Sequence, residues 1–227
     1  MVVGSLPLSQ LGRTWGTGTW YAERTMRLHG SMTSPYVRKV RVLLDEKQLP
    51  YTFVRENPRS LDSQTQALTP LGKVPVLVLD SGRTMIDSPV ILEYLDGLGG
   101  EPLLPVRGEA RWDVLHWTSL ADGLLQALVT RLLELRRPEA LRSPESLAWE
   151  ERRIGRVLDV LAQADLSSGF FVGGRYSLAD VAVGVALEYT DLRYPHAWRE
   201  RHPALGAWLA GIAARPAFQR TVFDTVP

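Results

Sequence analysis

The chain has 227 residues, of which 45% are hydrophobic and 22% charged, a composition typical of water-soluble globular proteins. Its 26 basic and 25 acidic side chains leave a formal net charge of +1, so the overall charge favours neither nucleic acid nor an acidic membrane surface as a partner. No apolar run approaches the roughly 20 residues that span a bilayer, and the amino end lacks the pattern of a secretory signal. We therefore expect a soluble, cytoplasmic protein of one large or two small domains.

The sequence contains no cysteine, which excludes disulfides, thiolate metal sites and cysteine nucleophiles of the protein's own. Its four histidines are not spaced to place two on one helical face with an acid between them, as a zinc hydrolase requires. We expect no bound metal and no permanent cofactor. Any thiol chemistry must use the sulfur of a bound molecule.

Residues 1–25 mix Gly, Ser, Thr and Trp without a steady period, and we expect a loose extension there. The hydrophobic pattern that follows predicts a strand at 26–31, a helix at 35–47, a strand at 51–54, an irregular or weakly helical stretch at 59–68, a hairpin of 73–80 and 83–87 joined by Ser81-Gly82, and a helix after Ser88-Pro89 that ends at glycines. The order of these elements predicts a small α/β domain over 26–99.

Residues 100–108 are rich in glycine and proline and are expected to form a linker. Beyond the linker the strand signals stop. Apolar residues at helical spacing predict helices at 109–136, 144–164, 177–189, 202–214 and 216–220. We therefore expect an all-helical domain over 109–227.

Ser34 precedes Pro35 at the start of the first predicted helix, which makes the serine the expected N-cap. The same pattern recurs at Ser88-Pro89. Each helix start offers a hydroxyl, free backbone N–H groups and the positive end of the helix dipole, and such groups favour anions. The local sequence by itself favours a purely structural cap at Ser34.

Pro75 lies where a strand is expected to begin, and the local sequence predicts a trans Val74-Pro75 bond. Lys73 is expected to be exposed beside a turn, and Asp87 to lie near a helix start.

Two other features have structural interpretations. The basic side chains of Arg38, Lys39 and Arg41 are expected on a solvated helix face. Ser177 and Asp180 have capping-box spacing ahead of an apolar helix, and we assign them no catalytic role.

The segments "TSPYVRK", "TPLGKVPVL", "DSPVILEYL" and "SLADVAV", together with the order of elements, resemble the cytosolic glutathione S-transferases. The helix start is most similar to the serine-dependent branches of that family, and the whole chain to small bacterial members. The resemblance covers about Met26 to Thr221. It implies an α/β plus all-α architecture, in which a thioredoxin-like domain precedes a helical bundle.

The resemblance also implies roles for particular residues. Ser34 occupies the position that donates a hydrogen bond to the glutathione sulfur, with Thr33 as the rival donor. Val74 precedes a proline that the family holds cis, and its backbone pairs with the cysteinyl part of glutathione.

Ser88 and Asp87 are expected to bind the γ-glutamyl end, although many members have Glu or Gln at the position of Asp87. Lys73, and secondarily Arg59, are the candidates for the glycyl carboxylate.

The hydroxyl of Ser34 can accept a backbone N–H as a cap and still donate its own proton. Lowering a thiol pKa of about 8.5 by about two units requires roughly 2.7 kcal/mol. A charge-assisted hydrogen bond supplies about 1.5 to 3 kcal/mol and a helix terminus about 0.3 to 1, so together they suffice. A covalent role for Ser34 is not expected, because no neighbour in the sequence resembles an activating base.

The second substrate is expected to bind between the domains. The candidates there are Tyr36, Trp117, Arg131, Tyr189 and Arg193.

These features lead us to expect a homodimeric, cytoplasmic glutathione transferase of detoxification type that conjugates glutathione to a small apolar electrophile. Two alternatives are a non-catalytic glutathione-binding carrier or regulatory module, and a glutathione-dependent peroxidase or dehalogenase.

Overall fold

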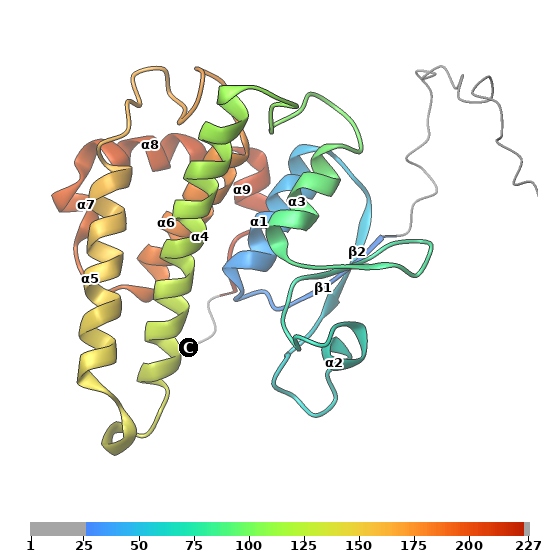
Figure 1. Cartoon of the computed structure of the whole chain (residues 1–227), viewed down its shortest axis with the longest axis horizontal. Coiled ribbons are helices and arrows are strands. Elements are labelled where there is room, and N and C mark those ends of the chain that lie inside the picture. The colour runs from blue at the N-terminus through green and yellow to red at the C-terminus, as the bar shows by residue number, and fades with distance from the viewer. Residues whose placement is uncertain (1–25, 225–227) are drawn as a thin grey trace, which may run out of the picture.

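The computed structural model describes residues 26–224, so the extension predicted at 1–25 lies outside the described residues. A small sheet with helices on its faces packs beside a larger group of helices (Figure 1). Over the described residues, no helix combines the length and hydrophobicity that crossing a bilayer requires.

The first half of the chain forms a four-stranded sheet with two longer helices and one short helix. Its elements are β1 (Met26–Gly30), α1 (Pro35–Glu46), β2 (Tyr51–Arg55), α2 (Thr65–Leu68), β3 (Val76–Val78), β4 (Thr84–Met85) and α3 (Ser88–Asp96). The strand order is β2-β1-β3-β4, with β1 parallel to β2 and antiparallel to β3. This confirms the predicted thioredoxin-like arrangement and the β3-β4 hairpin.

Helix α1 begins directly beside the end of β1, and a glycine allows this close approach. A Cβ atom added at Gly30 would lie 2.6 Å from a methyl carbon of Val37, a distance that real side chains do not tolerate. The apolar face of α1, including Val40 and Leu43, is fully buried against the sheet and the neighbouring helices. The first turn of α1 is therefore held firmly at the edge of the sheet.

The second half is helical. Its elements are α4 (Glu109–Leu135), a short 3-10 turn (Glu139–Leu141), α5 (Pro144–Leu161), α6 (Leu178–Arg193), α7 (Trp198–Arg201), α8 (Pro203–Ala213) and α9 (Pro216–Arg220). Helix α4 packs on α5 and α6, and in Figure 1 it lies between α5 and the first domain. The predicted helical bundle is confirmed, and the short helix α7 was not predicted.

Helix α6 is buried along most of its length and begins with the predicted capping box. The backbone N–H and the hydroxyl of Ser177 both donate to Asp180 at 2.8 Å. Phe171 N–H donates to the other carboxylate oxygen at 2.9 Å. The Ser177 hydroxyl and both carboxylate oxygens of Asp180 therefore have partners, as a structural cap requires.

The expectation that Arg38, Lys39 and Arg41 form a solvated face was wrong. All three side chains are buried, because α1 packs against the helical domain on that face. Arg38 pairs with Glu188 of α6 at 2.5 Å, Lys39 pairs with Asp122 of α4, and Arg41 donates to the carbonyl of Thr221 at 3.4 Å. The basic cluster thus ties the two domains together.

Candidate functional site

Three chain segments meet at one edge of the sheet, and the strand register explains why. His29 near the end of β1 pairs with Val76 at the start of β3, and Leu77 pairs with Met85 at the end of β4. The segments 31–34, 74–75 and 86–88 therefore leave or enter the sheet at the same edge. The sheet brings together the predicted glutathione-binding segments that carry Ser34, Val74 and Ser88, while Arg59 lies outside them in the loop between β2 and α2.

At the first segment, Ser34 caps α1 as predicted. Its hydroxyl oxygen accepts the N–H of Val37 at 3.4 Å, and Pro35 occupies the first helical position. Within residues 26–224 the hydroxyl proton of Ser34 is not donated to any other group. This proton lies where the α1 dipole is positive, and it can be donated to an anion.

Thr33, the rival donor, lies one residue before the cap. Its hydroxyl is 3.0 Å from the hydroxyl of Ser31, and its N–H donates to the same oxygen at 3.3 Å. These contacts hold Thr33 within the turn that precedes α1.

At the second segment, the Val74-Pro75 bond is cis. The trans bond expected from the local sequence was therefore wrong, and the geometry agrees with the family resemblance. Pro75 is buried and Val74 half-buried. The backbone N–H and C=O of Val74 make no hydrogen bond to another residue that the structure describes, so both are available to a ligand's backbone.

At the third segment, the cap is not the serine that the Ser-Pro pattern suggested. Asp87 is the N-cap of α3 and its carboxylate accepts the N–H of Ser88 at 2.5 Å, so Ser88 is the first helical residue. The Ser88 side chain is fully buried, and its hydroxyl oxygen has no hydrogen-bond partner among the described residues. A buried unpaired hydroxyl is costly in the free protein, and a ligand carboxylate would satisfy it.

Lys73 and Arg59 are both exposed. Lys73 directly precedes Val74 at the sheet edge, and no ion pair involving it is present in residues 26–224. Arg59 lies in the loop between β2 and α2, where its N–H donates to Asn57 at 3.2 Å.

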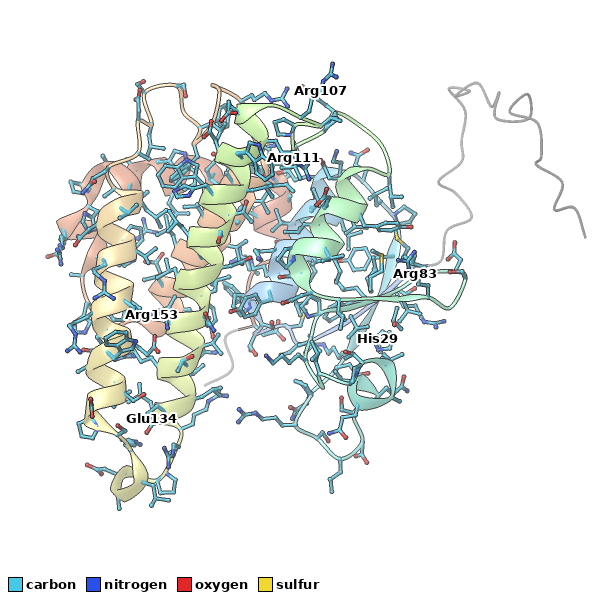
Figure 2. The ribbon with its side chains drawn as sticks, in the orientation of Figure 1. His29, Arg83, Arg107, Arg111, Glu134 and Arg153 are labelled. Atoms are coloured by element: carbon cyan, nitrogen blue, oxygen red, sulfur yellow. The ribbon has the colours of Figure 1, made fainter. Side chains whose placement is uncertain are left out.

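A buried hydrogen bond between His29 and Glu56, which the sequence did not predict, anchors that loop. His29 lies at the end of β1, above α2 in Figure 2, and its Nδ1 is 3.1 Å from the carboxylate of Glu56. Glu56 also accepts from the hydroxyl of Ser63 at 2.9 Å and the N–H of Gln64 at 3.2 Å. Burial acts to raise the pKa of Glu56, but these hydrogen bonds outweigh burial and hold the pKa below its usual range.

The predicted acceptor residues divide into two groups. Tyr36 lies in the first turn of α1, and burial, followed by the nearby carboxylates of Asp122 and Asp87 and by Tyr189, raises the pKa of its hydroxyl. Tyr36 is therefore a neutral hydroxyl at neutral pH. Arg193 lies beside Tyr189, with its guanidinium carbon 5.9 Å from the centre of the tyrosine ring.

Trp117 and Arg131 have their contacts inside the helical domain. The ring of Trp117 packs edge-on against Phe171 with their centres 4.9 Å apart. Arg131 is ion-paired with Glu151 at 3.0 Å. Arg131 also donates to the backbone carbonyl of Arg193 at 3.4 Å, so it lies next to the carboxyl end of α6. The structure thus brings Tyr36, Tyr189 and Arg193 near one another with Arg131 beside Arg193, and places Trp117 against Phe171.

Asp122 is a residue that the sequence analysis missed. It lies on α4, pairs with Lys39 and affects the hydroxyl of Tyr36. The sequence signal that could have identified Asp122 is an acidic residue in the middle of a helix whose other residues are mostly leucine and alanine or other uncharged types. Among the described residues there is no group of three or more histidines and carboxylates placed to hold a metal ion.

Comparisons with known proteins place this geometry in a family. The family profile "Glutathione S-transferase, N-terminal domain" matches residues 28–102, and "Glutathione S-transferase, C-terminal domain" matches residues 126–211. The Escherichia coli (strain K12) protein "Uncharacterized GST-like protein YibF" is 35% identical over 198 residues, which cover 86% of this chain and 98% of that protein.

Two solved structures are similarly close. A glutathione S-transferase from Methylobacillus flagellatus KT with glutathione bound has 36% identity and a TM-score of 0.84, covering 87% of this chain and 99% of that one. A glutathione transferase family member from Pseudomonas fluorescens Pf-5 with bound S-(propanoic acid)-glutathione has 36% identity and a TM-score of 0.78, covering 87% and 98%. The chain belongs to the glutathione S-transferase family.

Proposed function

We propose that the protein is a glutathione transferase that uses Ser34 to lower the thiol pKa of bound glutathione and delivers the thiolate to a small electrophile. The observation that carries the proposal is the pair of helix starts at one sheet edge. There the Ser34 hydroxyl keeps a proton to donate, and the buried Ser88 hydroxyl has no hydrogen-bond partner within residues 26–224. Both groups lie where helix dipoles favour negative charge.

The tripeptide would lie along this edge. Its γ-glutamyl carboxylate would accept from the Ser88 hydroxyl and the first N–H groups of α3, with Asp87 beside its ammonium group. Its cysteinyl backbone would pair with the free N–H and C=O of Val74. Its glycyl carboxylate would meet Lys73, with Arg59 as the second candidate.

The sulfur would lie at the start of α1. The Ser34 hydroxyl would accept the N–H of Val37 and donate to the thiolate, which stabilises the thiolate over the thiol and lowers the thiol pKa. Thr33 is the weaker candidate because its hydroxyl already contacts Ser31. Ser34 has no hydrogen-bonded base, so a covalent role for the serine has no support.

The known relatives support conjugation as the reaction type. The Pseudomonas fluorescens protein binds S-(propanoic acid)-glutathione, in which carbon is attached to the glutathione sulfur, and the Methylobacillus flagellatus protein binds glutathione itself. We extend the proposal to a cytoplasmic homodimer that acts in detoxification, as the family resemblance implies.

The test is a pH titration of thiolate absorbance with bound glutathione, in the parent and in Ser34→Ala. We expect a thiol pKa below 7 in the parent, and a pKa about one to two units higher in Ser34→Ala because a charge-assisted hydrogen bond is lost. An unchanged pKa in Ser34→Ala would refute the role of Ser34. Glutathione binding without a shifted thiol pKa in the parent would favour a non-catalytic carrier.

Ser143→Ala is a matched control. Ser143 also precedes a proline at a helix start, and its hydroxyl accepts the N–H of Ser146 at 3.2 Å. Both alanine variants should lose about 1 kcal/mol of cap stability. Only Ser34→Ala should change the thiol pKa, and an equal change in Ser143→Ala would mean that the effect is indirect.

A further inference from the structure

An arginine without a counter-ion lies at the carboxyl end of α6. Arg193 is the last residue of that helix and is half-buried. Its Nε is buried and has no hydrogen-bond partner in the described part of the chain, and no ion pair there includes its guanidinium. A charged group withdrawn from water without a partner is unfavourable, so this position has an unfilled place for a negative charge.

The carboxylates at this end of the helical domain cannot supply that charge, because each is already engaged. The pairs are Glu188 with Arg38 at 2.5 Å, Asp191 with Arg199 at 2.6 Å, and Glu151 with Arg131 at 3.0 Å. Among the described residues, Arg193 therefore has no carboxylate partner, and the carboxyl end of the α6 dipole is the negative pole beside it. A second cation, Arg136, lies close enough to act electrostatically on Tyr189 and is likewise without an ion pair among residues 26–224.

Tyr189 connects this charge to the proposed site of the sulfur. The guanidinium carbon of Arg193 lies 5.9 Å from the centre of the Tyr189 ring, and the charge of Arg193 opposes the rise that burial causes in the pKa of Tyr189. Tyr189 in turn acts on the hydroxyl of Tyr36, which lies two residues after Ser34. Arg193, Tyr189 and Tyr36 therefore form a series of neighbouring groups that leads from α6 to the first turn of α1, where Ser34 is the cap.

Aromatic rings pack beside Arg193. The ring of Phe223 packs on Tyr189 with their centres 5.5 Å apart, and Arg38 lies 4.3 Å from the centre of the Phe223 ring on the domain boundary. Tyr189 is buried and Phe223 half-buried, so a ligand that ends at the Arg193 guanidinium would have the ring of Phe223 as its nearest partly exposed apolar neighbour. That arrangement suits an apolar body that carries an anionic group at its far end.

We infer that Arg193, held beside Tyr189, binds a carboxylate or similar anion on the second substrate, so that the preferred electrophiles have an apolar body with a terminal negative charge. This inference rests on the proposed function and names its substrate class. In turnover the thiolate sulfur forms a bond to the electrophilic carbon, and a leaving group such as chloride departs with the electron pair. The anionic group held by Arg193 is not consumed.

The test compares two glutathione conjugates that differ only in that charge, S-(4-carboxybenzyl)glutathione and its neutral amide S-(4-carbamoylbenzyl)glutathione. Calorimetry on the full chain should give at least about tenfold tighter binding of the carboxylate, as expected for a charged hydrogen bond. In Arg193→Met the ratio of the two dissociation constants should fall to about one. Equal binding of both conjugates by the parent, or a preference retained in Arg193→Met, would overturn the inference.

Two further variants keep the result interpretable. Arg152→Met removes an exposed charge beside Trp149 on α5, outside the site, and should leave the preference unchanged. If Arg152→Met also lost the preference for the carboxylate conjugate, the preference would be due to the net charge of the protein, which would contradict the assignment of the anion site to Arg193. Arg193→Lys retains the charge without the fork of donors, and should keep part of the preference.

Binding of unmodified glutathione and its thiol pKa, measured in the same variants, separate this inference from the proposed function. Both should be unchanged in Arg193→Met, which also establishes that the variant is folded. A parent that binds glutathione with a normal thiol pKa yet prefers the carboxylate conjugate would refute the proposed catalysis and support the anion site. A parent with a lowered thiol pKa that binds the two conjugates equally would support the proposed catalysis and refute the anion site.

Discussion

Helices α3 and α6 both begin with a serine and an aspartate, but only at α6 do both of these side chains have hydrogen-bond partners among the described residues. At α6, Asp180 accepts three hydrogen bonds, two of them from Ser177, and both residues are buried. At α3, Asp87 caps the helix from an exposed position, while the buried hydroxyl of Ser88 has no partner in the part of the chain that the structure describes. The contrast separates a helix start that completes the fold from one that is complete only with a ligand.

The strongest way to test this contrast is Asp180→Ala. Loss of the carboxylate leaves the buried N–H groups of Phe171 and Ser177 unpaired, so we expect a loss of about 3 kcal/mol in the free energy of unfolding. Urea unfolding measures this loss. Asp165→Ala is the control, because exposed Asp165 accepts from Ser167 N–H and should matter far less. Equal losses in the two variants would contradict a special role for the capping box.

Ser88→Ala should behave in the opposite way. Removing a buried hydroxyl without a partner should leave the urea midpoint unchanged or slightly higher, while the dissociation constant for glutathione rises about tenfold. Ser177→Ala is the matched variant at α6, and it should lose about 1 kcal/mol of stability with unchanged glutathione affinity. A destabilised Ser88→Ala with normal affinity would mean that Ser88 has a structural role.

Much of this architecture could be predicted from the sequence, because its signals are local. The amphipathic stripe of α1, the turn at Gly82 and the cap at Ser34 depend on neighbours within a few residues. The cap at Asp87 was missed because the Ser-Pro pattern favoured Ser88, and the choice depends on how the chain leaves β4.

The burial of the basic residues on α1 could not be predicted by local reasoning. Lys39 is buried because its partner Asp122 lies 83 positions further along the chain, and Arg38 because α6 supplies Glu188. Nothing within the α1 sequence indicates those partners. Sequence periodicity predicts which residues share a helix face, but burial of a charge depends on what the rest of the fold brings to it.

The contrast between satisfied and free groups also applies to the neighbours Thr33 and Ser34. The Thr33 hydroxyl already contacts Ser31, so Thr33→Ala should lose only about 0.5 to 1 kcal/mol of stability and leave the thiol pKa of bound glutathione unchanged. Ser31→Ala removes the same contact and should give a similar result. Thiolate titration and urea unfolding measure both effects, and a raised thiol pKa in Thr33→Ala alone would transfer the proposed donor role to that residue.

The smallest expected effect concerns Glu56. Like Asp180, its carboxylate accepts several hydrogen bonds, but the pKa of Glu56 is lowered whereas that of Asp180 is raised. Because its folded pKa lies below the unfolded value of about 4.3, Glu56 contributes stability that is fully present above that value. This contribution is lost as the pH falls through the folded pKa. Urea unfolding between about pH 6 and pH 3 should therefore show the advantage of the parent over Glu56→Gln shrinking at the acid end. Stability curves that stay parallel would show that the contacts with His29 and Ser63 do not depend on the charge of Glu56, and that the loop is held by packing.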